Sequence, residues 1–378
     1  MLRFLTAGES HGRALSGILE GFPEGVKISR EFIDGELSRR QSGFGRGKRM
    51  GIEKDKARIV SGLRDSKTLG SPISFYIENK DNTINTFSKD TLEVLNIPRP
   101  AHADFAGVLK YEVKDVRNIL ERASARETAC RVVIGAFCKQ LLNIFDIDII
   151  SSVAGLGKVS CPRKDMSIKE IKQALKGSSL GCVDRKKEKL MMNEIKSAER
   201  EGDTLGGLVD ITVEGVPPGL GSFMHWDKRL SAKLSFALMS IPAVKGVEIG
   251  RGFEYAVMSG RKSHDGIYYK KGKGFYFKTN NSGGILGGIS SGQPITLRIA
   301  MKPISTLRHS LDSVDFLTGK KAKAPVIRSD TTAVTACGVV AESMTAFVLA
   351  DAFLEKFSSD TLARIKLNYK NYLKGIKY

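Results

Sequence analysis

Aromatic residues and cysteines are both scarce in this sequence. Aromatic side chains make up 7% of its 378 residues, with a single tryptophan, so stacking platforms for single-stranded nucleic acid are not favoured. The five cysteines are scattered and odd in number, and they form neither a CxxC pair nor the His/Cys spacing of a metal site. We therefore expect reduced thiols in a cytoplasmic protein that holds no metal.

Several signatures of common protein classes are also missing. The sequence contains no GxxxxGK[ST], no GxGxxG and no HExxH, which disfavours a Walker or Rossmann nucleotide site and a zinc protease. Glu9 and His11 interrupt any apolar region of a signal peptide. No stretch approaches the roughly 20 apolar residues that a membrane helix needs, so we expect no membrane partner.

Cations greatly outnumber anions in the chain. It has 60 lysine and arginine residues against 41 aspartate and glutamate residues, which gives a formal net charge of +19. Such an excess indicates nucleic acid, an anionic membrane surface or a small molecule with several negative charges, unless the surface is merely basic. Because no long uniform lysine/arginine tract occurs, we expect no nucleic-acid partner. DNA binding that weakens steeply with salt would mark this alternative.

Two of the five histidines lie in segments rich in glycine or proline. His11 belongs to residues 8–12, just after the short apolar run 2–5. This is typical of a strand that ends in a tight turn and presents polar side chains to a cavity. His102 lies in the segment Arg99–Asp104. Because histidine titrates near neutral pH, the two segments predict acid–base chemistry on an anionic substrate.

Two pairs of segments suggest an internal repeat in the sequence. Residues 18–25 resemble 212–219, and residues 70–75 resemble 292–297, each as a strand beside a glycine/proline turn. These matches predict two similar ββα-type halves of a single domain, with chance similarity of turns as the alternative. The predicted parts are halves at about 1–145 and 205–378, their helices at about 124–142 and 339–357, and a helical insertion at about 146–204 with helices at 168–175 and 184–201.

Clustered arginines mark a candidate anion site. The segment 39–49 has five cations and no acid, and it includes Arg40 and Arg46. Its glycines let backbone N–H groups approach a ligand closely, although a solvated loop is the alternative. Arg122 and Arg126 lie four residues apart on a predicted helix, where like charges repel by roughly a few tenths of a kcal/mol. A bound phosphate or carboxylate would turn that cost into a gain.

Two further segments suit a cofactor or an acid. Gly283–Gly292 is too rich in glycine for a packed strand and leads, after one strand, to Lys302–Thr306. Glycines followed by lysine, serine and threonine suit a phosphorylated planar cofactor against the backbone, although hairpin turns give the same composition. Arg328–Asp330 precedes the last apolar helix, where Asp330 is either a cap or a carboxylate of the site.

A serine hydrolase is the alternative function. Residues 8–12 and 288–292 both fit GxSxG, the nucleophile elbow. An elbow requires a strand before it and a helix after it, within a doubly wound sheet. Only one strand can precede residue 8, and each match is followed by another strand pattern. The sequence therefore favours acid–base chemistry by the two histidines over a serine hydrolase.

Together these segments resemble the chorismate synthase family along nearly the whole chain. The stretches that resemble its three signatures are Gly8–Gly12 with Leu19–Pro23, then Ser124–Thr128, then Arg328–Asp330 with Ala341–Met344. Residues 242–250 and 283–292 are similar to further family segments. Several specific motifs occur in the expected order, which makes chance resemblance a poor explanation.

The resemblance implies a carbon–oxygen lyase of the shikimate pathway, which supplies aromatic amino-acid biosynthesis. Such a lyase converts 5-enolpyruvylshikimate 3-phosphate into chorismate and phosphate by 1,4-anti elimination, with no net redox change but with a requirement for reduced FMN. The implied fold is α+β, a β-α-β sandwich with two similar internal repeats, assembled as a homotetramer. NADPH is a possible reductant, and a separate flavin reductase is the other possibility.

The resemblance also implies roles for individual residues. His11 would protonate the departing phosphate, His102 would serve the protonation state of the reduced flavin, and Asp330 would help the flavin take the C6 hydrogen. The implied contacts of substrate or NADP are Ser10, Arg40, Arg46 and Arg126. The implied flavin contacts are Arg122, Ala123, Ser124, Pro242, Ala243, Gly287, Lys302, Pro303, Ile304, Ser305, Thr306 and Arg328. Holding so many phosphates and carboxylates requires several fixed cations.

Three positions depart from the family pattern. Pro242 stands where many members have asparagine, Thr331 where proline is common, and Ser16 also differs. These changes affect local contacts and not the reaction. The histidines at 225, 264 and 309 have no motif support and are left out of the site.

Overall fold

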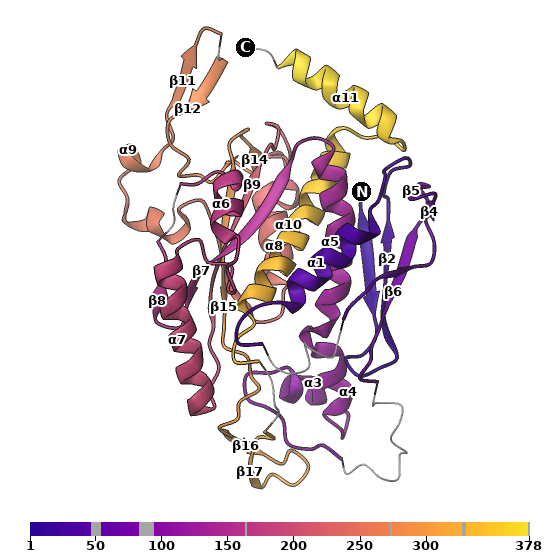
Figure 1. Cartoon of the computed structure of the whole chain (residues 1–378), viewed down its shortest axis with the longest axis vertical. Coiled ribbons are helices and arrows are strands. Elements are labelled where there is room, and N and C mark those ends of the chain that lie inside the picture. The colour runs from indigo at the N-terminus through magenta and orange to yellow at the C-terminus, as the bar shows by residue number, and fades with distance from the viewer. Residues whose placement is uncertain (47–53, 83–93, 163–164, 273, 327–329, 377–378) are drawn as a thin grey trace.

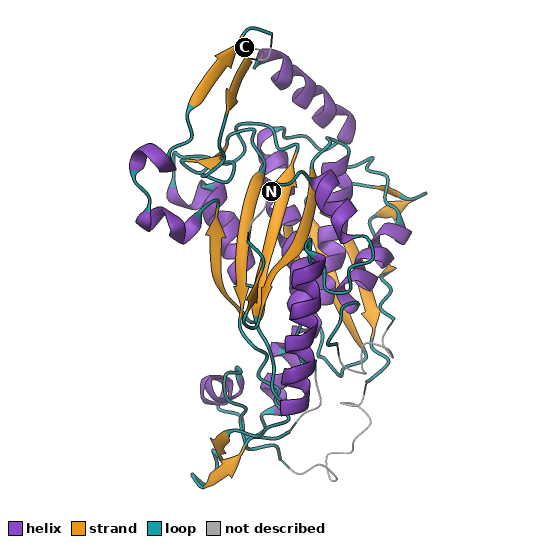
Figure 2. Cartoon of the chain, turned by 60° about the vertical axis from the view of Figure 1, so that its left-hand side comes forward, coloured by secondary structure: helices purple, strands orange, loops and turns teal. Residues whose placement is uncertain are grey.

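Two antiparallel sheets enclose a layer of helices (Figure 1). The computed structural model describes residues 1–46, 54–82, 94–162, 165–272, 274–326 and 330–376. The first sheet has the order β1 (Arg3–Ala7), β2 (Ala14–Glu20), β6 (Ile73–Glu78), β3 (Arg58–Ile59). The second, seen in Figure 2, has the order β10 (Val244–Ile249), β15 (Ile295–Met301), β9 (Gly207–Glu214), β7 (Asp148–Leu156), β8 (Val159–Ser160).

The long helices form the middle layer. They are α1 (Arg30–Gln41), α5 (Thr128–Asn143), α8 (Leu230–Met239) and α10 (Val334–Lys356). Helix α5 packs on β2, α10 packs on β7 and β9, and the two helices pack on each other. The arrangement is thus sheet, helices, sheet, and the predicted α+β class is confirmed.

Alternating burial explains how the strands face the helices. In β15, Ile295, Leu297, Ile299 and Met301 are buried, and the residues between them are partly exposed. Strand β2 alternates in the same way, because successive side chains of a strand point to opposite faces. Gly17 of β2 lies against the Phe75 ring, and a Cβ there would stand 2.4 Å from Phe75 Cζ. A side chain at position 17 would therefore displace a core ring.

The two sheets follow the same order of elements along the chain. The first half runs β1, β2, α1, β3, β6, α5, and the second runs β7, β9, α8, β10, β15, α10. In the first sheet β2 lies between β1 and β6, and in the second sheet β9 lies between β7 and β15. Strand β7 falls within the range expected to be a helical insertion, and α6 (Ile168–Leu175) and α7 (Arg185–Glu201) follow it.

Smaller elements lie around this frame. They are β4 (Leu63–Arg64), β5 (Lys67–Thr68), α3 (Asp104–Tyr111), α4 (Arg117–Ala123), η2 (Ala125–Glu127), η3 (Trp226–Lys228), η4 (Gly252–Val257), α9 (Gly260–Ser263), β11 (Ile267–Lys270), β12 (Gly274–Phe277), β13 (Ile285–Leu286), β14 (Ile289–Ser290), β16 (Asp312–Val314), β17 (Lys321–Lys323) and α11 (Leu362–Gly375). Helices α3 and α4 contact each other at one end of the molecule (Figure 1).

Helix α10 is the central element of the fold. By length and composition it could cross a membrane, contrary to the sequence expectation, but 89% of its most apolar window is buried inside the protein. Its apolar character follows from its place between the sheets. It also binds the start of the chain, because the Leu2 N–H donates to Asp351 Oδ1 at 2.8 Å. Gly135 of α5 allows close packing, since a Cβ there would stand 2.2 Å from Ser343 Cβ of α10.

A buried group of charges ties four elements together. The Glu342 carboxylate of α10 accepts two hydrogen bonds from Arg39 of α1, at 2.7 and 2.8 Å, and one from Lys139 of α5 at 2.5 Å. It also accepts from the N–H and hydroxyl of Ser151 in β7, at 2.8 and 2.6 Å. Glu36 of α1 binds both cations, so two buried carboxylates balance the buried Lys139 and the partly exposed Arg39.

The five cysteines are buried free thiols. Burial raises the pKa of Cys182 to about 11 and that of Cys337 to about 12. Cys182 and Cys337 therefore stay protonated at neutral pH and act as core packing groups.

We expect Glu342→Gln to lower the free energy of unfolding by about 3–5 kcal/mol, because it removes one of the two carboxylates that balance the buried Lys139 and the partly exposed Arg39. Burial alone would raise the pKa of Glu342, but Lys139 and Arg39 hold it well below its usual range. The stabilisation is therefore complete above the unfolded pKa of about 4.3 and is lost as pH falls through the folded pKa. Urea titrations at pH 5–8 should give a constant difference between the two proteins.

The matched control is Glu355→Gln, which removes an exposed carboxylate that pairs with Lys228 and Lys233, each at 3.0 Å. Exposed pairs contribute less than about 1 kcal/mol. Equal losses in the two variants would contradict the role of burial.

Candidate active site

His11 lies in the turn between β1 and β2 and is held by a buried carboxylate. Glu121, near the end of α4, accepts the His11 main-chain N–H at Oε2 (2.8 Å), and its Oε1 lies 2.9 Å from Nδ1 of the ring. The Glu121 side chain is 8% exposed and that of His11 is 31% exposed. On the other side of the ring, Nε2 lies 3.8 Å from Asp81 Oδ2. Glu121 thus fixes the imidazole on its Nδ1 side, and the ring stays exposed enough to contact a ligand.

His102 has a similar arrangement in the turn before α3. Its Nδ1 lies 2.5 Å from Oδ1 of Asp104, which is fully buried. Arg99 donates to both oxygens of this carboxylate, from Nε at 2.8 Å and from Nη2 at 3.0 Å. Burial would raise the pKa of Asp104, but hydrogen bonds from His102 and Arg99 keep it below its usual range. Asp104 therefore stays charged and orients the ring.

Arg40 and Arg126 meet at Asp55, close to the His11 turn, because Asn79 contacts both Arg126 and the Gly12 carbonyl. Nη1 of Arg126 lies 2.6 Å from Asp55 Oδ2, and its Nε donates to Asn79 Oδ1 at 3.0 Å. Nη1 of Arg40 lies 3.8 Å from the same Asp55 oxygen. Both arginine side chains are nearly buried, and the Asp55 side chain is fully buried. One carboxylate thus gathers two guanidinium groups.

The charge of Arg40 is only partly compensated. Its Nε and Nη2 donate to Thr128 Oγ1 and to the Ala125 carbonyl, both at 3.0 Å. Within the described parts of the chain, its buried Nη1 has no hydrogen-bond partner. Burial, together with the nearby charges of Arg46 and Arg126, lowers the pKa of Arg40 to about 10 despite Asp55. Positive charge in this region therefore exceeds what its neighbours neutralise.

Arg46 pairs with Asp330, which the sequence places far away. Nη1 of Arg46 lies 2.6 Å from Asp330 Oδ2. The pair is held by the backbone, because the Thr331 N–H donates to the Gly45 carbonyl at 2.9 Å. Burial lowers the pKa of Arg46, and Asp330 opposes that change. Arg328, a predicted flavin contact, lies outside the described residues.

Ser10, Arg122 and Ser124 connect the first turn to α4. The Ser124 hydroxyl donates to Ser10 Oγ at 3.2 Å, and the Ser10 N–H donates to the Glu121 carbonyl at 3.0 Å. Nη2 of Arg122 donates to the carbonyl and hydroxyl of Thr6 at 2.8 and 2.9 Å. Ala123 ends α4 between Arg122 and Ser124. These predicted residues therefore lie together around the His11 turn.

The predicted cofactor segments around Ala243 and Lys302 also come together. The Lys302 N–H donates to the Ala243 carbonyl at 2.9 Å, which places Pro242 beside the segment Pro303–Thr306. The Lys302 ammonium donates to the Ala101 carbonyl at 2.5 Å, in the residue before His102. Burial and the charge of Lys245 lower the pKa of Lys302. A second cationic region thus lies beside His102.

Gly287 does not join this group. It lies in the turn between β13 and β14, and the next carbonyl, of Gly288, accepts the N–H of Leu230 at the start of α8 (2.8 Å). Ala243 follows the opposite end of α8. The ten-residue helix separates the two positions by about 15 Å, at 1.5 Å per residue.

Sequence reasoning missed several acids and their partners. Glu121, Asp55, Asn79 and Arg99 were not predicted as site residues, and Asp104 was only part of a motif. Asp104 could have been found, because an acid two residues from a histidine in a tight turn is within reach of the ring. Glu121 lies 110 residues after His11, and no local pattern joins them.

Neither serine of the GxSxG matches has the surroundings of a nucleophile. Ser10 lies between two strands, and its hydroxyl meets Ser124. Ser290 is buried in β14, where its hydroxyl donates to the Pro217 carbonyl at 2.7 Å and accepts from the Leu220 N–H at 2.8 Å. Both hydroxyls contribute to structure, which disfavours the hydrolase alternative.

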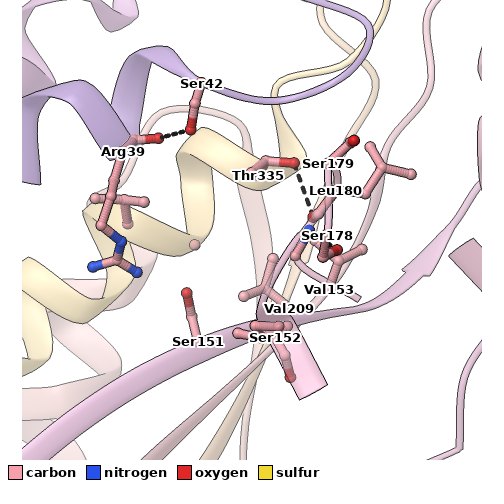
Figure 3. A pocket seen from close by; sticks show the side chains of 14 residues that line it. Arg39, Ser42, Ser151, Ser152, Val153, Ser178, Ser179, Leu180, Val209 and Thr335 are labelled. Atoms are coloured by element: carbon pink, nitrogen blue, oxygen red, sulfur yellow. Dashed lines mark hydrogen bonds between the residues drawn. The ribbon is translucent and has the colours of Figure 1, made fainter. Parts of the chain in front are cut away.

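A cavity of about 170 Å³ lies beside Arg39 and Ser42, at the start of the basic segment 39–49 (Figure 3). Its walls include Arg39, Ser151 and Thr335. The hydroxyls of Ser151 and Thr335 already bond to Glu342 and to the Leu180 carbonyl, and Arg39 is bonded to Glu342. Arg39 and Ser42 come from the segment 39–49, but among the described residues none that was predicted individually for the site lines this cavity. We therefore assign it no ligand.

Comparisons with known proteins agree with the motifs. The family model described as chorismate synthase matches residues 2–354. A protein of Alkaliphilus metalliredigens named chorismate synthase is 51% identical, with 98% of this chain and 99% of that protein covered. Its counterpart from Desulforudis audaxviator is 48% identical, with 100% and 98% covered.

A solved structure gives the same result. The structure titled "Crystal Structure of Chorismate Synthase" aligns with a TM-score of 0.81 and 39% identity, covering 100% of this chain and 98% of that one. The chain therefore belongs to the chorismate synthase family, as its motifs predicted.

Proposed function

We propose that this chain eliminates phosphate from 5-enolpyruvylshikimate 3-phosphate to give chorismate, at the site around His11 and the buried arginines. The observation that carries the proposal is the under-compensated charge of Arg40, whose buried Nη1 has no partner in the described residues. A substrate with one phosphate and two carboxylates would supply the missing negative charge. A neutral substrate would leave it buried without compensation.

The residues fit two anionic ligands. Arg40, Arg46 and Arg126, gathered around Asp55 and Asp330, suit the substrate. Lys302, which lies near Lys245 and the His102 turn, suits the phosphate or ring oxygens of reduced FMN. When bound, reduced FMN supplies electron density that stabilises the electron-poor substrate as phosphate leaves.

Proton transfer falls to the two histidines. His11 would donate a proton to a phosphate oxygen while the C–O bond breaks, and the bonding electron pair would leave with the phosphate. The C6 hydrogen is lost from the substrate as the new double bond forms, so the overall reaction involves no net redox change. His102, oriented by Asp104, would maintain the protonation state of the reduced flavin.

Asp330 has a dual position. Its ion pair with Arg46 places a carboxylate beside the basic segment 39–49. We propose that Asp330 helps the C6 hydrogen to leave, and that Arg46 both orients Asp330 and binds substrate.

The wider organisation is also a proposal. The shared order of elements in the two sheets supports two repeats at about 1–145 and 205–378, with β7 joining the second sheet. Exposed apolar side chains on and near α8, such as Trp226 and Phe236, support a homotetramer. NADPH as reductant, a separate flavin reductase and a cytoplasmic location stay predictions from the family resemblance.

Anaerobic turnover tests the function directly. With chemically reduced FMN, we expect chorismate and phosphate to form from 5-enolpyruvylshikimate 3-phosphate in equal amounts. Oxidised FMN should give neither product. Phosphate release without chorismate, or turnover with oxidised FMN, would contradict the proposed reaction.

Each histidine should matter for turnover and not for folding. We expect His11→Ala and His102→Ala to lower kcat by about 100-fold or more, the range for loss of a general acid or base. His225→Ala, at an exposed histidine paired with Asp227, is the matched control and should keep its activity. Wild-type rates in either site variant would remove that histidine from the mechanism.

Loss of the Arg46 cation should weaken substrate binding. We expect Arg46→Ala to raise KM by about tenfold or more, because one charge-assisted hydrogen bond to an anion contributes roughly 1.5–3 kcal/mol. Arg251→Ala, which removes an exposed arginine that pairs with Glu254, controls for net charge. An unchanged KM at both low and high salt would contradict the role of the basic segment.

A further inference from the structure

Glu121 makes two contacts with His11 and one with the neighbouring Ser10. Its carboxylate accepts the His11 main-chain N–H at 2.8 Å and lies 2.9 Å from ring Nδ1. Its own carbonyl accepts the Ser10 N–H at 3.0 Å. The Glu121 side chain is 8% exposed. One nearly buried residue of α4 therefore fixes both the backbone of the turn and the plane of the imidazole.

The contact with Nδ1 determines which nitrogen of His11 can exchange a proton. An ionised carboxylate only accepts hydrogen bonds, so the hydrogen between these groups must be carried by Nδ1. The proton that reaches a ligand must then come from Nε2, on the side of the ring away from Glu121. The same logic applies to the carboxylate that orients the histidine of a hydrolase triad.

We propose that Glu121 is a positioning residue for proton transfer by His11, because it fixes the Nδ1–H tautomer and directs Nε2 toward the substrate. This inference rests on the proposed role of His11. In the step, the proton on Nε2 passes to a phosphate oxygen as the C–O bond breaks. His11 is left neutral, with Nδ1–H still bonded to Glu121, and water returns the proton to Nε2.

Glu121→Gln separates positioning from mere support of the turn. Its amide oxygen can still accept the His11 main-chain N–H, but its NH₂ group would face Nδ1 and favour the opposite tautomer. The matched control is Glu127→Gln. Glu127 is also a buried carboxylate of this region, but it pairs with Arg131 at 2.9 Å.

Ring ¹⁵N chemical shifts of histidine-labelled protein read the tautomer without any turnover. The His11 signals are assigned by their loss in His11→Ala. We expect protonated Nδ1 for neutral His11 in the wild type and in Glu127→Gln, and protonated Nε2 in Glu121→Gln. The same tautomer in all three proteins would overturn the proposal.

Kinetics provide a second reading. We expect Glu121→Gln to lower kcat by about 10- to 100-fold, within the range of general acid catalysis, and to change KM by less than about threefold. In the His11→Ala background the same change should have little further effect, because the two residues act as one unit. Full additivity of the two changes would overturn the proposal.

The two readings separate this inference from the proposed function. If wild type forms no chorismate, the proposed function fails, and the ¹⁵N shifts still decide whether Glu121 sets the tautomer. If wild type is active and the tautomer does not respond to Glu121→Gln, only the role of Glu121 is lost.

Discussion

Burial of positive charge is the constraint on which this structure depends. Arg40, Arg46 and Arg126 are drawn out of water by the same packing that forms the core, and each would be costly there without a counter-charge. Asp55 and Asp330 supply that charge incompletely. The remaining deficit favours a ligand with several negative groups.

The same device recurs behind both histidines. Glu121 stands behind His11 and Asp104 behind His102, each on the Nδ1 side of its ring. The difference lies in the second partner, because Arg99 binds Asp104 through both carboxylate oxygens. A fixed acid costs no reorganisation when a proton moves, which is how preorganised sites gain rate. The two histidines therefore share one kind of support but have different surroundings.

Local sequence patterns predicted the helices and the catalytic histidine candidates better than the acids that bind the site residues. The helices α6 and α7 and the turn that carries His11 follow from periodicity and glycine content, because these signals lie within one element. Glu121 and Asp55 could not be predicted, since tertiary packing alone brings them to His11 and Arg126. The family resemblance grouped Gly287 with the other cofactor residues, yet the length of α8 separates it from Ala243 in a single chain.

The hydrogen bond from Leu2 to Asp351 has a consequence for biosynthesis. It joins residues 349 positions apart, and Asp351 belongs to α10, which packs on β7 and β9 of the second sheet. During translation β7 and β9 therefore leave the ribosome long before the helix that covers them has been made. Contacts of such long range form slowly, and the waiting chain exposes apolar faces that attract chaperones or other chains. The yield of this protein in cells should depend on the supply of chaperones and on the speed of translation near the 3′ end of its messenger RNA.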